Sequence, residues 1–155
     1  MTEITEGATA PDITLPRDGG ETFRLADLRG RKVVLYFYPK DDTSGCTSEA
    51  KDFSAEADAF AAKDAVVVGV SKDSVTSHDK FRDKHALNLA LLSDAEGDVA
   101  ERYGVWVEKS MYGRKYMGIE RATFLIDAEG KIARIWRKVK VKGHVAEVAG
   151  ALDSI

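Results

Sequence analysis

The only cysteine of the 155-residue chain, Cys46, lies in the stretch YFYPKDDTSGCTSEAK. An apolar run ends at Pro39 and an amphipathic segment begins at about Thr47, so the cysteine lies where a predicted strand gives way to a predicted helix. The first turn of a helix has unpaired N–H groups and a partial positive charge, which favour a thiolate. Because the thiolate is the nucleophilic form of cysteine, this position indicates nucleophilic or redox chemistry.

The local sequence leaves two interpretations of Cys46 open. Many free cysteines are small, inert, buried hydrophobic residues. Here, however, the neighbours Thr43, Gly45 and Thr47 are small and mostly polar, and such a loop can point backbone N–H groups at one atom. A reactive thiol also needs a nearby cation. Arg121 is the candidate, since it precedes the predicted strand ATFLID, which can lie beside the strand KVVLYFY; an ordinary surface arginine is the alternative.

The elements that would position these residues follow an alternating pattern. The short apolar runs KVVLYFY, AVVVGVS and LALLSD predict buried strands. Apolar residues at helical spacing predict helices over 47–63 and 74–86, with Ser74 opening the second. A short helix is expected in AEGDVAERYG and a closing helix in HVAEVAGAL.

Hairpins are predicted before and after this alternating unit. PDITLPRDGGETFRL predicts two strands around Asp-Gly-Gly, and ATFLID and KIARIW predict two more joined through AEG. Between them, GVWVEKSMYGRKYMGIE is interpreted as a long basic and aromatic connection without periodicity, either solvated or a partner-docking loop. The order predicts an α/β, thioredoxin-like fold: a central mixed β-sheet flanked by helices, with an N-terminal β-hairpin.

Composition narrows the function classes. With 44% hydrophobic residues, the chain can form one core, and we expect residues 1–155 to be a single domain. A net charge of −3 offers no basic field for nucleic acid or an anionic membrane, and the longest apolar run, VVLYFY, is far below the roughly 18 residues of a membrane span. Because MTEITEGATAPD lacks the features of a signal peptide, we expect a cytoplasmic protein.

Pro39, Thr43 and Cys46 form the pattern P-x-x-x-T-x-x-C, which is the active-site signature of the peroxiredoxins. The longer string FYPKDDTSGCTSEAKDF resembles their bacterioferritin comigratory protein, or peroxiredoxin Q, branch, as do LLSDAEGDVAERYGVWVEKSMYGRKYMGIERATFLIDAEGKI and KVKVKGH. The resemblance covers essentially the whole chain. It implies a thioredoxin-fold peroxidase that reduces hydrogen peroxide and organic hydroperoxides in antioxidant defence.

The resemblance also implies a role for each matching residue. Cys46 would be the peroxidatic cysteine, whose thiolate attacks the terminal peroxide oxygen and becomes a sulfenic acid. Thr43 would hydrogen-bond the sulfur and the incoming peroxide, and Pro39 would shield the sulfur from water. Arg121 would stabilise the thiolate and polarise the peroxide. Fixed donors aimed at both atoms would stabilise the transition state more than the ground state.

The chain departs from many relatives in its cysteines. Some carry a resolving cysteine five positions beyond the first, where this chain has Lys51, and others carry it in the next helix, where this chain has no cysteine near Lys84. An intramolecular disulfide is therefore impossible. The sulfenic acid must be reduced by an external thiol: thioredoxin, as the resemblance suggests, or glutathione with glutaredoxin, or another small thiol. We expect a monomer.

No metal is expected, because His78, His85 and His144 are scattered without other ligands at suitable spacing and are interpreted as solvated surface residues. No cofactor is expected either, since the glycines do not form a nucleotide-binding spacing. Two rival functions are a redox sensor, in which oxidised Cys46 changes a partner contact without turnover, and a thioredoxin-like interaction module with an inert cysteine.

Overall fold

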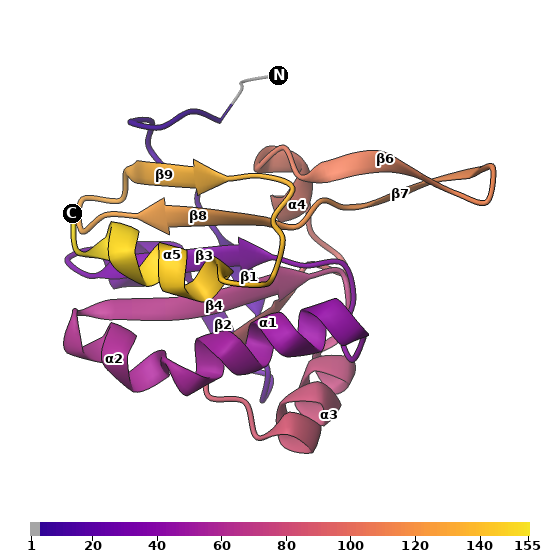
Figure 1. The fold of residues 1–155 in the computed structure, drawn as a ribbon, viewed down its shortest axis with the longest axis horizontal. Helices are drawn as coiled ribbons and strands as arrows, with labels where there is room; N and C mark the ends of the chain where they lie inside the picture. The colour runs from indigo at the N-terminus through magenta and orange to yellow at the C-terminus, as the bar shows by residue number, and fades with distance from the viewer. Residues whose placement is uncertain (1–3) are drawn as a thin grey trace.

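The structure is a computed structural model that describes residues 4–155, and its centre is a five-stranded sheet in the order β5-β4-β3-β8-β9 (Figure 1). The strands of this sheet are β3 (Lys32–Phe37), β4 (Ala65–Ser71), β5 (Ala90–Ser93), β8 (Ala122–Ile126) and β9 (Ile132–Trp136). β3, β4 and β5 are parallel, whereas β8 runs antiparallel to both β3 and β9. The predicted mixed sheet is therefore confirmed.

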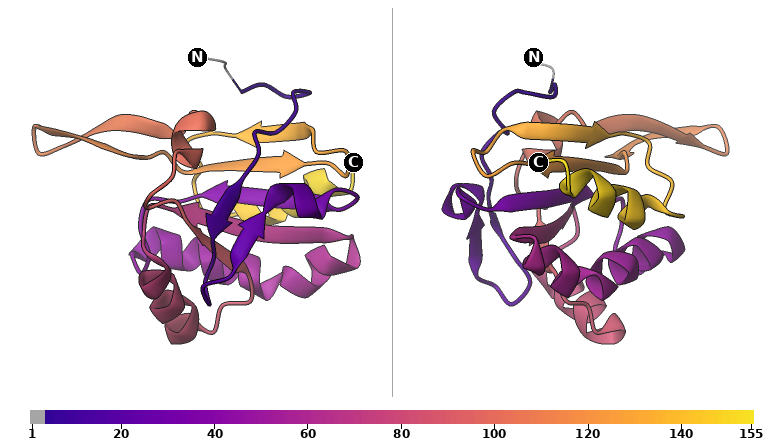
Figure 2. Two further views of the ribbon diagram at one scale, coloured as in Figure 1. Left: turned by 180° about the vertical axis from the view of Figure 1, so that it is seen from behind. Right: turned by 60° about the vertical axis from the view of Figure 1, so that its left-hand side comes forward.

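Two layers cover the sheet. On one face, apolar side chains such as Phe53, Phe81 and Val148 form a core with the strands. The helices that supply this layer are α1 (Ser44–Ala55), α2 (Ala57–Ala62), α3 (Val75–His85) and α5 (His144–Leu152). On the other face, Leu15 and Tyr103 belong to a second core. This second layer consists of the hairpin β1 (Thr14–Pro16) and β2 (Thr22–Arg24), the 3₁₀ helix η1 (Leu25–Leu28) and α4 (Val99–Arg102); Figure 2 shows the hairpin from behind.

The helix predicted over 47–63 is two helices and begins earlier than expected. α1 begins at Ser44, and the chain turns at Glu56 before α2. The Glu56 N–H bonds to the carbonyl of Phe53, a closure one residue tighter than that of an α-helix, which ends the first helix. As a result Cys46 is the third residue of α1, inside its first turn.

The prediction of a non-periodic connection before β8 was wrong. Residues Trp106–Met111 (β6) and Arg114–Ile119 (β7) form an antiparallel hairpin that projects from the body of the molecule (Figure 1). Its turn residues Tyr112 and Gly113 both have positive φ, 52° and 78°, as a two-residue hairpin turn requires. Most of its side chains are exposed or half-buried, so the hairpin lacks the alternating burial by which strands are recognised in a sequence.

The antiparallel pairing of β8 with β3 brings the functional segments together. Phe37, the last residue of β3, pairs with Ala122, the first residue of β8. Arg121 therefore lies at the same end of the sheet as the segment that leads from β3 into α1. From the sequence these strands could be neighbours, as they are, but in a parallel-type sheet; the antiparallel direction found here is what places Arg121 at that end.

Candidate active site

Cys46 is a buried residue at the start of α1, with 1% of its surface exposed. The helix begins after Thr43, whose extended backbone (φ −92°, ψ 158°) is that of an N-cap residue. The Thr43 carbonyl accepts a hydrogen bond of 2.8 Å from the N–H of Thr47. The thiol thus lies beside the positive end of a twelve-residue helix, as the sequence predicted.

Arg121 provides the cation at this thiol. Its Nη2 lies 3.4 Å from Cys46 Sγ and donates to the sulfur, while its Nη1 donates to Glu49 Oε1 over 2.7 Å. A Cβ atom on Gly45 would lie 3.1 Å from Nη2, so the absence of a side chain there leaves room for the guanidinium. The bridging position fixes the direction of the guanidinium, because two of its nitrogens are held by two different acceptors.

Glu49 is the residue that the sequence analysis missed. Its side chain has no exposed surface, and burial raises the pKa of this carboxyl to about 7 despite the opposing effect of Arg121. Among residues 4–155 its Oε2 has no hydrogen-bond partner. The signal was its spacing: Glu49 follows Cys46 by three residues, so both side chains share one helix face.

Thr43 and Pro39 lie on the segment that precedes Cys46. The Thr43 hydroxyl donates to the carbonyl of Lys40 over 2.8 Å, which leaves its oxygen lone pairs available as acceptors. The side chain of Thr43 is on the exposed side of the segment, whereas Pro39 is half-buried. The segment therefore has an internal hydrogen bond that holds Thr43 at the helix entrance, and the roles assigned to both residues stay predictions.

The prediction that the three histidines are solvated was wrong. His78 and His144 are 0% and 4% exposed, and the side chain of His85 is 14% exposed. His144 Nε2 lies 2.7 Å from the Thr123 hydroxyl, and His85 pairs with Asp42 over 2.9 Å. Within residues 4–155, no group of three or more His, Cys, Asp or Glu is arranged to hold a metal ion.

The positions where some relatives carry a second cysteine hold lysines. Lys51 is exposed on α1, and Lys84 on α3 lies 2.7 Å from Asp42 Oδ2. Cys46 is a free, buried thiol. A reducing thiol must therefore come from another molecule.

A cysteine in the first turn of a helix, beside a thioredoxin-like sheet and with an arginine donating to its sulfur, is the arrangement expected of the thiol peroxidases called peroxiredoxins. The family profile described as AhpC/TSA matches residues 7–135. The chain belongs to the AhpC/TSA family and, within it, to the Bcp or peroxiredoxin Q branch.

Individual relatives span nearly the whole chain. Peroxiredoxin Bcp of Bacillus subtilis is 54% identical over 98% of this chain and 97% of its own length. A cysteine-to-serine mutant of Xylella fastidiosa PrxQ superimposes with a TM-score of 0.93 at 37% identity, covering 99% of this chain and 98% of its own. A structure of Xanthomonas campestris bacterioferritin comigratory protein, reported for its alkyl peroxide reduction activity, gives a TM-score of 0.87 at 43% identity, covering 92% and 90%.

Proposed function

We propose that Cys46 is the peroxidatic cysteine and that it acts on hydrogen peroxide and alkyl hydroperoxides. The observation that carries the proposal is the 3.4 Å contact between Arg121 Nη2 and Cys46 Sγ in the first turn of α1. The thiolate attacks the terminal peroxide oxygen: the S–O bond forms, the O–O bond breaks, and the leaving oxygen takes up a proton to give water or an alcohol. Sulfur is oxidised by two electrons to a sulfenic acid, and the peroxide is reduced by two.

The neighbouring residues act on the charge that moves in this step. Arg121 stabilises the thiolate and then the developing negative charge on the leaving oxygen. The Thr43 hydroxyl, which already donates to the Lys40 carbonyl, accepts the O–H of the incoming peroxide on its free lone pairs and so aligns the two oxygens. Pro39, half-buried beside this turn, limits the access of water to the sulfur.

We also propose that an external thiol completes the cycle. A first thiol attacks the sulfenic sulfur, releasing water and forming a mixed disulfide, and a second thiol releases reduced Cys46 and a disulfide. Thioredoxin and glutathione with glutaredoxin both supply two thiol equivalents. Since Cys46 is 1% exposed, the start of α1 has to open before a protein thiol can reach the sulfur.

Two further proposals concern the compartment in which the enzyme works and its oligomeric state. The enzyme works in the cytoplasm, where thiols are kept reduced. It works as a monomer, because Cys46 Sγ, Arg121 and Glu49 form their contacts within one chain.

The test is the rate at which reduced protein loses its thiol after one equivalent of hydrogen peroxide, followed by tryptophan fluorescence and by mass, with Cys46→Ser as control. The expected result is oxidation orders of magnitude faster than that of a free thiol, with a gain of one oxygen atom. Oxidation at the rate of a free thiol would contradict the proposal. Turnover of excess peroxide with thioredoxin or with glutathione and glutaredoxin then identifies the reductant, and a stall after one equivalent with every donor would favour a sensor.

A further inference from the structure

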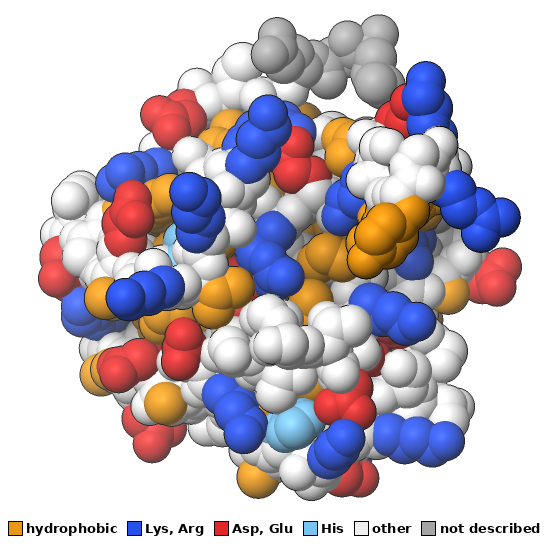
Figure 3. Space-filling model, turned by 45° about the vertical axis from the view of Figure 1, so that its right-hand side comes forward, with side chains coloured by type: hydrophobic (Ala, Val, Ile, Leu, Met, Phe, Trp, Pro, Cys, Tyr) orange, Lys and Arg blue, Asp and Glu red, His pale blue; other side chains and the backbone are white. Residues whose placement is uncertain are grey.

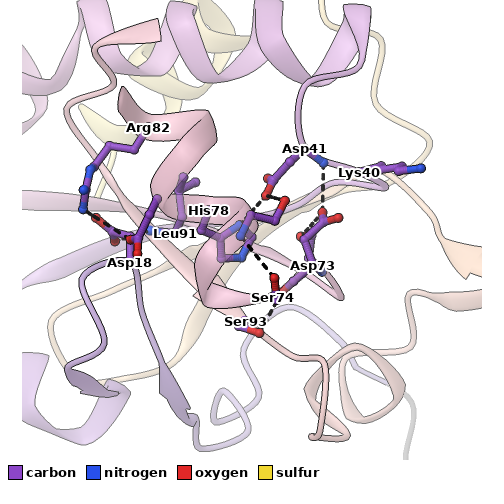
Figure 4. Close-up of polar contacts among 12 residues, drawn as sticks. Asp18, Lys40, Asp41, Asp73, Ser74, His78, Arg82, Leu91 and Ser93 are labelled. Carbon is purple, nitrogen blue, oxygen red and sulfur yellow. Dashed lines mark hydrogen bonds and ion pairs between the residues drawn. The ribbon is translucent and has the colours of Figure 1, made fainter. Parts of the chain in front are cut away.

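The loop between β3 and α1, residues 38–43, is held by a buried polar cluster that the peroxidatic chemistry above does not use. Asp41 is the centre of this cluster and is 7% exposed. Its Oδ1 accepts from the Tyr38 hydroxyl over 2.5 Å, its Oδ2 accepts from the Ser77 hydroxyl over 2.8 Å, and its N–H donates to Asp73 Oδ2 over 2.8 Å. Both the backbone and the side chain of Asp41 are therefore anchored; Figure 4 shows Asp41 beside Asp73 and His78.

His78, on α3, completes the cluster from inside the core. The ring is 0% exposed; Nε2 lies 2.7 Å from the carbonyl oxygen of Leu92, and Nδ1 lies 2.7 Å from Asp41 Oδ2. A carbonyl oxygen carries no hydrogen, so Nε2 must be the donor in the first contact. The second contact then also needs a hydrogen, placed either on Nδ1 or on the carboxyl group.

The other contacts of Asp41 decide where this hydrogen lies. Hydroxyl groups of Tyr38 and Ser77 both donate to the carboxylate, and donors of this kind favour its ionised form. Burial raises the pKa of Tyr38, so its hydroxyl keeps its proton and remains a donor. The hydrogen therefore lies on Nδ1, which makes His78 an imidazolium paired with an Asp41 carboxylate.

The remaining surroundings of the ring also favour the positive charge. The titratable groups that face it are Tyr38 and Asp41 from the loop after β3 and Asp73 from the loop after β4, while β5 contributes the Leu92 carbonyl. Burial opposes the charge, yet the pKa of His78 is raised above its ordinary value by Asp41, Leu92 and Asp73.

We propose that His78 is a positioning residue for the peroxidase reaction: as a doubly protonated ring bonded to Asp41 and to the Leu92 carbonyl, it holds the 38–43 loop in the form that presents Thr43 and Cys46 to peroxide. The proposal rests on the assignment of Cys46 as the peroxidatic cysteine. The residues that His78 holds lie close to the reactive ones. Asp41 precedes Thr43 by two residues, and Tyr38 packs in the same core cluster as Cys46.

This role has a defined pH dependence. A histidine whose pKa is raised on folding contributes fully below its unfolded value of about 6.5, and the contribution is lost as the pH rises through the folded value. The loop is thus held at about pH 6.5 and below, and it loosens as the pH rises through the raised pKa of His78. Oxidation of Cys46 should therefore slow as the pH rises through that value.

The first measurement is made on the full-length, reduced parent protein, by following the ring nitrogens of His78 by ¹⁵N NMR against pH. The expected result is a ring that is still doubly protonated at about pH 6.5 and loses its second proton only above the ordinary pKa of a histidine. A ring that has already lost this proton below about pH 6.5 would overturn the proposal. This readout is independent of the function of Cys46, so it separates a failure here from a failure of the proposed peroxidatic role.

The second measurement is the rate of Cys46 oxidation by one equivalent of hydrogen peroxide for His78→Gln, across about pH 5.5 to 9. We expect the rate at about pH 6.5 to fall about tenfold, as for a modest misplacement of reacting groups, and the decline at higher pH to vanish. Ser74→Ala is the matched control: it removes the N-cap of α3, which accepts from the Ser77 N–H over 3.1 Å, without removing an ionisable group.

A parent-like rate in His78→Gln, or equal losses in both variants with an unchanged pH profile, would refute positioning by His78. Should His78→Gln fail to fold, Asp41→Asn provides the test. This variant keeps an acceptor for Tyr38 but removes the counter-charge, so His78 should become neutral at a lower pH and oxidation should slow. A His78 titration identical to that of the parent would contradict the assigned pair.

Discussion

Glu49→Gln isolates the buried carboxyl beside Cys46 and Arg121. Burial raises the pKa of Glu49 from 4.5 to about 7, so the folded protein keeps a proton on this group that the unfolded chain has already lost. Stability therefore decreases as the pH rises from about 4.5 to about 7, which is the opposite of a carboxyl with a lowered pKa. At 1.36 kcal/mol per pH unit, the decrease is about 3 kcal/mol over this interval.

Glutamine has nearly the same shape, can accept from Arg121 through its amide oxygen, and does not titrate. The free energy of unfolding of the parent minus that of Glu49→Gln should thus fall by about 3 kcal/mol between pH 4.5 and 8. Subtracting the two values removes the contributions that other groups titrating in the same range make to the free energy of unfolding. The assay is urea denaturation of both reduced proteins across that range, followed by the fluorescence of Trp106 and Trp136.

Glu56→Gln is the matched control. Glu56 is exposed at the end of the same helix, so the corresponding difference should change by less than about 0.5 kcal/mol. A difference between the parent and Glu49→Gln that stays constant with pH would refute the argument, because it would mean that folding does not raise the pKa of Glu49.

Two further predictions concern the residues around the sulfur. Thr43→Val keeps the side-chain shape but removes the hydroxyl and its bond to the Lys40 carbonyl. Oxidation of Cys46, followed by stopped flow, should slow by about tenfold or more, and the free energy of unfolding should fall by about 1 kcal/mol. Unchanged kinetics would contradict the role of Thr43. Arg121→Lys replaces two separated nitrogens by one, so a single ammonium cannot hold both Cys46 Sγ and Glu49 Oε1 in the present geometry. Oxidation should again slow by about tenfold or more in the same assay, and a parent-like rate would show that charge alone is enough.

The sheet could be predicted because its strands are short, apolar runs, and a central strand such as β3 is buried along nearly its whole length. The hairpin 106–119 could not, because it projects from the body and no regular alternation of buried and exposed residues marks its strands. Its turn signal was Tyr112-Gly113, which is less familiar than Asn-Gly but adopts the same positive φ angles.

This hairpin keeps most of its apolar and basic residues on the surface. Met111, Tyr112 and Met117 are 57%, 98% and 48% exposed, and Lys115 and Arg114 lie beside them. Figure 3 brings forward the side from which the hairpin projects, and Lys and Arg side chains are spread over this face among hydrophobic groups. The apolar residues of this hairpin are therefore largely exposed to solvent, so their spacing does not show the alternation expected of a strand that packs on a core.

Some residues of the site could be found from the sequence, and others could not. Cys46 and Arg121 could be found because a reactive thiol needs a helix terminus and a cation, and strand neighbours limit where the cation can come from. Glu49 and His78 were missed because charged side chains on a helix are normally solvated. In α3 the buried residues His78 and Phe81 are three positions apart and so lie on the same face of the helix. This spacing could have indicated that His78 faces the core.

The contacts of α3 bear on the loop before Cys46 at two levels. His78 and Ser77 bind Asp41, and one turn or more further on Lys84 and His85 bind Asp42. Asp42 has a positive φ of 60°, in the left-handed region that Asp adopts more readily than most non-glycine residues, and its contacts with Lys84 and His85 help to hold it there. Because Cys46 is the only cysteine of the chain, α3 supplies no thiol to the proposed cycle, and its contacts can serve to keep the loop in place for peroxide.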